Sequence, residues 1–122
     1  MLIGVPKEIK PQENRVGLTP AAVRSYVMQG HDVVVQATAG EGSGLTDAEY
    51  VAAGARILGA AEEVWGTAEM ICKVKEPIAP EYGLIREGQI LYTYLHLAPD
   101  RPQTEALLAS GCVAFAYETV EV

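Results

Sequence analysis

The clearest sign of the fold is the stretch TPAAVRSYVMQGHDVVVQ (residues 19–36). It opens with Thr19 and Pro20, a hydroxyl residue and a proline that suit the N-cap and first position of a helix, and Gly30 marks the helix end. Apolar residues recur between them at helical spacing. The run DVVVQ (Asp32–Gln36) then carries β-branched residues bounded by turn residues, as in a strand. The stretch predicts a helix that leads into a strand.

The same alternation continues along the rest of the chain. Runs rich in valine, isoleucine or tyrosine predict strands over Leu2–Val5, Asp32–Gln36 and residues 70–74, 89–94 and 113–117, with a short strand at Arg56–Leu58. The residues TDAE (46–49) form a capping box, which predicts a helix that ends near Gly54. Further helices are predicted over residues 60–65 and from about residue 100 to Gly111.

Alternating strands and helices favour parallel strands joined by right-handed crossovers, with helices on both faces of the sheet. We therefore expect an α/β fold of flavodoxin or Rossmann type, in a chain whose 122 residues suit one domain. The sequence ends directly after the last predicted strand, without the covering element that usually completes such a sheet. The sheet is thus expected to be incomplete at the C-terminus, and the chain to be part of a longer protein.

Composition excludes several kinds of partner. Nine basic and sixteen acidic residues give a net charge of −7, which argues against nucleic acid and against an anionic membrane surface. No apolar run approaches the roughly 20 residues that a membrane helix needs. Cys72 and Cys112 lie in apolar segments without CxxC spacing, so free buried thiols are expected rather than a disulfide or a metal site. We expect a soluble, cytoplasmic protein.

Residues that follow the strands are the candidates for binding and catalysis, because ligands of open α/β sheets bind beyond the carboxyl ends of the strands. Arg15 follows the first predicted strand, Lys75 the strand at 70–74, and His96 the strand at 89–94. Three such groups at one rim of an acidic protein indicate a small anionic ligand.

Each of these residues also has a simpler interpretation. Arg15 could be a solvated loop residue, although its planar fork suits a carboxylate. Lys75 could be a surface lysine at a strand end. His96 could be packed between two leucines, although an imidazole in such surroundings can also exchange protons near neutral pH.

Other residues at this rim have supporting roles or none. Glu8 and Glu118 are expected to orient the cations, or else to be simple surface acids. Tyr94, which alternates with Tyr92 on one strand, more often forms core or wall than a catalytic group. The sequence GEGSG (residues 40–44) follows a strand but lacks the spacing of a GxGxxG phosphate loop, so a surface turn is expected there and no cofactor site in this chain.

Several motifs, in order, resemble those of the alanine dehydrogenase and transhydrogenase family. They are GVPKE (residues 4–8), ENRVGLTP (13–20), CKVKEP (72–77), TYLHLA (93–98) and AYETVE (116–121). The resemblance runs the whole length of the chain. It is closer to alanine dehydrogenases, because transhydrogenase chains usually lack the histidine that His96 supplies.

The resemblance implies the reversible, NAD-dependent oxidative deamination of L-alanine to pyruvate and ammonia, in a hexameric enzyme. It implies that Arg15 binds the substrate carboxylate, that Lys75 contacts the substrate oxygens and polarises the keto group, and that His96 is the acid/base. It makes residues 1–122 part of the N-terminal substrate domain, with the NAD-binding Rossmann domain beyond them, so this chain alone is expected to be inactive. The alternatives are part of a transhydrogenase α-subunit, or a non-catalytic module that binds small anions.

Overall fold

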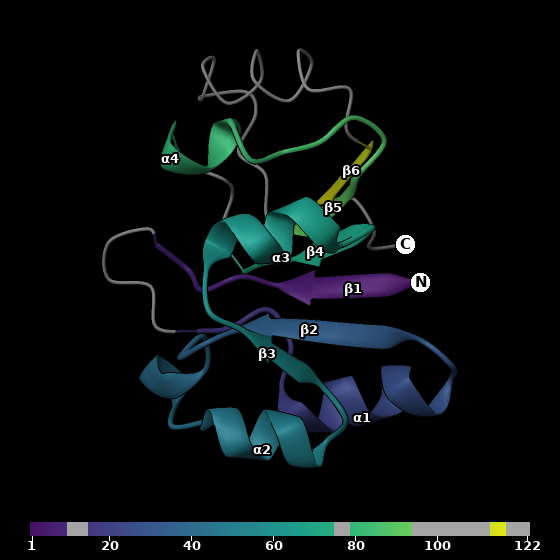
Figure 1. The fold of residues 1–122 in the computed structure, drawn as a ribbon, viewed down its shortest axis with the longest axis vertical. Coiled ribbons are helices and arrows are strands. Elements are labelled where there is room, and N and C mark those ends of the chain that lie inside the picture. Colours follow the sequence, from purple (N-terminus) through teal and green to yellow (C-terminus); the bar gives the residue numbers. More distant parts are fainter. Residues whose placement is uncertain (10–14, 75–78, 94–112, 117–122) are drawn as a thin grey trace.

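The computed structural model describes residues 1–9, 15–74, 79–93 and 113–116. Within them a parallel sheet of six strands has the order β3-β2-β1-β4-β5-β6 (Figure 1). The strands are β1 (Leu2–Val5), β2 (Asp32–Gln36), β3 (Arg56–Leu58), β4 (Met70–Cys72), β5 (Ile90–Thr93) and β6 (Val113–Ala116). The helices are α1 (Pro20–Met28), α2 (Asp47–Ala52), α3 (Ala61–Thr67) and α4 (Ala79–Tyr82), with a 3₁₀ turn, η1 (Glu41–Ser43). The predicted α/β fold with parallel strands is confirmed.

The strand order reverses between β1 and β4. The chain first builds outward from β1 through β2 to β3, then returns to place β4 on the other side of β1 and continues to β5 and β6. This is the order of dinucleotide-binding folds, in which the crevice at the reversal receives the ligand. The rim beyond β1 and β4 is therefore the first place to look for a site.

Helices cover both faces of the sheet, and each face has its own apolar core (Figure 1). On one face Ile3 and Val33 pack with residues of α1 and α2, including Tyr50. On the other, Val34 packs with α3, whose Val64 and Trp65 are buried. Successive side chains of β2 point to opposite faces of the sheet and so contribute to both cores. This explains why the three valines of β2 are all buried.

Gly4 allows α3 to approach β1 closely. A Cβ atom at this position would lie 2.6 Å from Cβ of Ala68 and 2.9 Å from Cγ1 of Val64, which is closer than carbon atoms pack. The glycine of the GVPKE motif is therefore a packing requirement of the sheet and helix.

The predicted helix starts are confirmed by their hydrogen bonds. Oγ1 of Thr19 accepts a hydrogen bond from the backbone N–H of Ala22 at 3.2 Å, and Oγ1 of Thr46 accepts one from that of Glu49 at 3.2 Å. Gly30, just beyond α1, has a φ of +94°, a conformation that favours glycine at a helix end.

Other boundaries differ from the predictions. The fourth strand ends at Cys72 rather than at residue 74, and α3 runs to Thr67 rather than to residue 65. Its N-cap residue, Ala60, makes no side-chain hydrogen bond, so no cap marks where α3 begins. Helix α4 was not predicted, because four residues are too few to show helical spacing. The helix predicted from about residue 100 to Gly111 lies outside the described residues.

Cys72 is a free, buried thiol, as predicted, and burial raises its pKa to about 12. Cys112 lies outside the described residues. In the described part of the chain, every helix is too short or too polar to cross a membrane.

Candidate functional site

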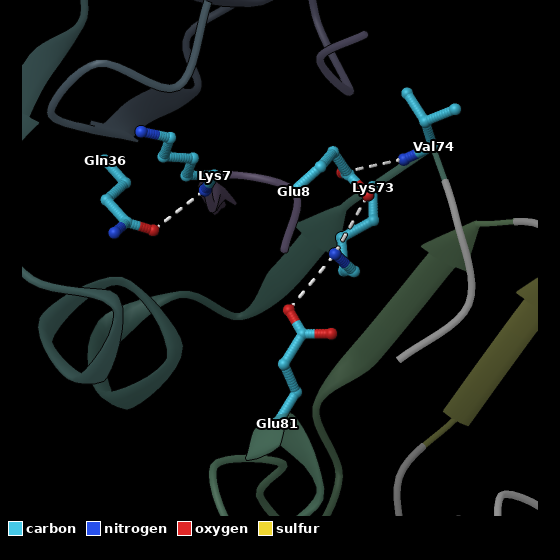
Figure 2. A network of polar contacts seen from close by, with 6 residues as sticks. All are labelled: Lys7, Glu8, Gln36, Lys73, Val74 and Glu81. Atoms are coloured by element: carbon cyan, nitrogen blue, oxygen red, sulfur yellow. Dashed lines mark hydrogen bonds and ion pairs between the residues drawn. The ribbon is translucent and has the colours of Figure 1, made fainter. Parts of the chain in front are cut away.

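Three charged side chains meet where β1 and β4 end (Figure 2). Glu8 follows β1, Lys73 follows β4 directly, and Glu81 comes from α4. The Nζ atom of Lys73 lies 3.1 Å from Oε1 of Glu8 and 3.1 Å from Oε2 of Glu81. All three residues are buried, and Lys73 is only 1% exposed. The crevice at the strand reversal is therefore closed by buried ionic contacts.

Glu8 also binds the backbone beyond β4. Its second carboxylate oxygen, Oε2, accepts a hydrogen bond from the backbone N–H of Val74 at 3.0 Å. One carboxylate thus ties the loop after β1 both to the side chain of Lys73 and to the main chain of the next residue (Figure 2). Buried charges are tolerated when they are paired and hydrogen-bonded in this way.

A pocket of about 180 Å³ lies on the β2 side of this network. Its lining residues come from the ends of β1 and β2 and the loops that follow: Lys7, Glu8, Arg15, Thr38, Ala39, Glu41 and Gly42. Two of these residues are cationic and two are acidic. A pocket of this size, with both signs of charge on its walls, suits a small polar ligand such as a carboxylate.

The loop that carries Arg15 is seated against the end of β4. At Gly17, two residues further on, an added Cβ would overlap the carbonyl oxygen of Cys72. Only glycine permits this approach without a shift of the backbone. The close contact brings the exposed Arg15 to the rim that Glu8 and Lys73 occupy.

The opposite wall of the pocket is held by β2 and its turn. The backbone N–H of Lys7 donates to Oε1 of Gln36 at 2.8 Å, and the ammonium of Lys7 donates to Oγ1 of Thr38 at 3.1 Å. Thr38 has a φ of +67°, which is strained for a β-branched residue, and its N–H donates to Oδ1 of Asp47 at 2.9 Å. Strain of this kind gathers at binding sites, where surrounding contacts maintain it.

Two of the predicted site residues fall within the described part of the chain, and the structure places them in one pocket. Arg15 and Glu8 both line it. Glu8 is 7% exposed, so its interpretation as a simple surface acid is wrong. Its carboxylate contacts Lys73, which was not among the cations that Glu8 was expected to orient, so a role in orienting Arg15, Lys75 or His96 stays a prediction.

Four predicted site residues lie outside the described residues: Lys75, Tyr94, His96 and Glu118. The meeting of Arg15, Lys75 and His96 at one rim stays a prediction. The GEGSG stretch is a turn, as predicted. It also contributes to the pocket, which Glu41 and Gly42 line.

Sequence reasoning missed Lys73 and Glu81. A signal for Lys73 was available, because it interrupts the apolar run MICKV (residues 70–74), where a charged side chain needs a buried partner. Glu81 gave no such signal. It lies in a short polar stretch, and only the folded chain brings it to Lys73.

The described residues do not fit the pyrophosphate of a dinucleotide, although the strand order is that of dinucleotide-binding folds. Such a site needs a glycine-rich turn after β1, where backbone N–H groups approach the phosphates. Here Pro6, Lys7 and Glu8 occupy that turn, and the Glu8–Lys73 pair fills the crevice. The described residues at the reversal of this sheet therefore do not form a pyrophosphate site.

Comparison with known proteins places this geometry in context. Residues 4–122 match the family model described as "Alanine dehydrogenase/PNT, N-terminal domain". The chain is 60% identical, over 122 residues, to the alanine dehydrogenase of Methanococcus maripaludis. That match covers 100% of this chain and 33% of the relative. It is 55% identical over 121 residues to the alanine dehydrogenase of Mycolicibacterium smegmatis, with 99% and 33% covered. The chain thus spans about a third of the length of the curated relatives it matches.

Two solved structures share the fold closely. An L-alanine dehydrogenase superposes with a TM-score of 0.97 at 52% identity, over 100% of this chain and 34% of that one. A transhydrogenase from Sinorhizobium meliloti superposes with a TM-score of 0.90 at 35% identity, over 97% and 35%.

Proposed function

Since this chain belongs to the alanine dehydrogenase/PNT family, as part of its N-terminal domain, we propose that it is the substrate-binding part of an alanine dehydrogenase. The whole enzyme would catalyse the reversible, NAD-dependent oxidative deamination of L-alanine to pyruvate and ammonia. The observation that carries this proposal is the pocket beyond the ends of β1 and β2, which Arg15 lines together with Glu8 in a chain of this family.

In this proposal Arg15 binds the substrate carboxylate. A guanidinium can form two parallel hydrogen bonds with a carboxylate, which fixes both its position and its orientation. The loop of Arg15 is well placed for this task, because Gly17 seats it against β4. Holding the carboxylate also fixes the α-carbon, and such positioning can contribute several kcal/mol to catalysis.

We assign Lys75 and His96 from their motifs. Lys75 would stabilise the negative charge that develops on the keto oxygen of pyruvate. His96 would exchange the proton when the carbonyl and amine forms of the substrate interconvert, which suits a group that titrates near neutral pH. Tyr94 and Glu118 would line or orient this part of the site.

NAD would supply the hydride chemistry when bound to the whole enzyme. Because the described residues do not fit its pyrophosphate, we propose that a Rossmann domain outside these 122 residues holds it. The chain's own contribution is to bind the substrate, to orient it and to move its proton. The intact protein is further proposed to be a cytoplasmic homo-hexamer, without nucleic-acid or membrane partners.

The test is an assay of the intact protein with pyruvate, ammonia and NADH. We expect NADH to be oxidised only when both pyruvate and ammonia are present. Hydride transfer between two nicotinamide nucleotides without ammonia would instead support the transhydrogenase alternative. That alternative is the weaker one, because the chain is 35% identical to the transhydrogenase structure and 52% identical to the L-alanine dehydrogenase structure. Binding of pyruvate without any turnover would support a non-catalytic module.

A further inference from the structure

The buried ionic contacts at the strand reversal call for an explanation beyond stability. Replacing a buried ion pair by apolar residues of similar volume is often neutral or stabilising, so such a pair is weak evidence for a stabilising role. Lys73 is nonetheless 1% exposed and is held by two carboxylates from separate segments. Directional contacts of this kind specify position better than apolar packing does.

Glu8 is the residue through which this network reaches the pocket. It lines the pocket together with Arg15. Its Oε1 contacts the ammonium of Lys73 at 3.1 Å, and its Oε2 accepts from the N–H of Val74 at 3.0 Å. Val74 is the residue before Lys75 in the sequence. A single carboxylate therefore stands between the pocket of the proposed carboxylate anchor and the backbone that leads to the proposed keto-oxygen ligand.

We propose that Glu8, held by Lys73, is a positioning residue for the keto-acid substrate. It sets the distance between the Arg15 pocket and the main chain at Val74, and so the spacing of the two cations that grip the substrate. This inference rests on the proposed function, because Arg15 and Lys75 are substrate ligands only within it. Neither Glu8 nor Lys73 needs to touch the substrate for this role.

Glu81 offers a matched control within the same network. It contacts the same ammonium at the same distance and is buried like Glu8, but it comes from α4 and does not line the pocket. Glu8→Gln and Glu81→Gln each neutralise one of the two carboxylates that contact Lys73 at 3.1 Å, so the two variants lose equal charge. In Glu8→Gln the amide NH₂ must face either the ammonium of Lys73 or the N–H of Val74, because both carboxylate oxygens of Glu8 accept hydrogen bonds.

The experiment compares the steady-state kinetics and Tm of both variants in the intact protein. For Glu8→Gln we expect kcat/KM for pyruvate to fall roughly 10- to 100-fold, mainly through KM, as for a misplaced binding group. The KM for NADH should stay near that of the unmodified protein. Glu81→Gln should lower Tm to a similar extent and change the KM for pyruvate several times less.

Two results would overturn the inference. One is a KM for pyruvate in Glu8→Gln that stays within threefold of the unmodified protein. The other is a parallel rise of the KM values for pyruvate and NADH in both variants, which a general loosening of the fold would cause. If Glu8→Gln does not fold, Glu8→Asp takes its place, because it keeps the charge but shortens the side chain so that one carboxylate no longer reaches both partners.

Hydrogen exchange separates this inference from the proposed function. Glu8→Gln should speed exchange of the Val74 amide more than Glu81→Gln does, whether or not the protein reduces pyruvate. Unchanged protection at Val74 would contradict the positioning role even in an active enzyme. An intact protein that does not turn over pyruvate, ammonia and NADH would contradict the proposed function, even if Val74 responds as expected.

Discussion

Strand β1 has two neighbours, and it meets them in different ways. Against β2, Ile3 lies in register with Val33, and Val5 with Val35; all four are buried in one apolar core. Beyond the ends of β1 and β4, the contact is made instead by buried charges, with Glu8 at its centre. Apolar packing contributes stability and tolerates exchange between residues of similar volume, whereas an ionic contact depends on the placement of a few atoms.

The comparison predicts a division of labour. Substitutions of exposed rim residues such as Arg15 should change the kinetics of the proposed reaction and leave Tm nearly unchanged, whereas those in the buried Glu8–Lys73–Glu81 network should also lower Tm. Substitutions under β1 and β2 should lower Tm and leave the kinetics of the folded protein unchanged. The predictions below are ordered by the size of the expected effect.

His96→Ala should produce the largest loss. If His96 is the acid/base, kcat with pyruvate, ammonia and NADH should fall roughly 10²- to 10⁴-fold. The Kd for pyruvate, measured by calorimetry, should change little. His31→Ala is the control, because His31 is the other histidine of the chain and lies before β2, at the opposite end of the strand from the rim. Retention of most activity by His96→Ala would show that another group moves the proton.

Arg15→Lys should weaken pyruvate binding by about tenfold or more. The substitution keeps the charge but replaces the planar fork by a point charge, and a hydrogen bond between charged groups contributes about 1.5–3 kcal/mol. Arg24→Lys, on the exposed face of α1, is the matched control. An unchanged KM for pyruvate would exclude Arg15 as the carboxylate anchor.

Gly4→Ala tests the apolar side of the comparison. The added methyl group would lie 2.6 Å from Cβ of Ala68, so we expect a loss of about 1–3 kcal/mol in the free energy of unfolding, with kcat unchanged. Gly66→Ala is the control: it lies in α3 with open space around it, and should be neutral or stabilising by up to about 1 kcal/mol. Loss of activity without loss of stability in Gly4→Ala would break the division of labour.

The smallest expected effect concerns pH. Burial raises the pKa of Cys72 from 9.0 to about 12, so above pH 9 the unfolded chain releases this proton while the folded one keeps it. The unfolded state is thereby favoured, and between pH 8 and 10 stability should fall by about 1 kcal/mol from this group. Cys72→Ala should remove that part of the fall. Urea denaturation of both proteins at the two pH values measures it, and parallel curves would contradict a buried thiol.

The sequence predicted those features of the fold that depend on neighbouring residues. The N-cap of α1 is made by Thr19 and a backbone N–H three residues away, and the three valines of Asp32–Gln36 indicate a strand. The boundaries of α3 were less accurate because Ala60 leaves its start unmarked. Sequence patterns therefore predict an element correctly where residues close in sequence determine its boundaries.

The candidate site could be predicted only in part, for the same reason. That Arg15 and Glu8 lie at one rim follows from their places after a strand. The partnership of Glu8 with Lys73 joins residues 65 positions apart, and no spacing rule indicates it. The positive φ of Thr38 was equally hidden, because a threonine is not the residue expected there.

The buried indole of Trp65 gives this chain a built-in optical probe. It is the only tryptophan in the 122 residues, belongs to α3 and is 1% exposed, in the core that includes Val34 and Leu91. Its emission reports on the α3 layer, and the pocket lies at the strand ends. Fluorescence can therefore follow the loosening of that layer separately from events at the rim, with no label attached.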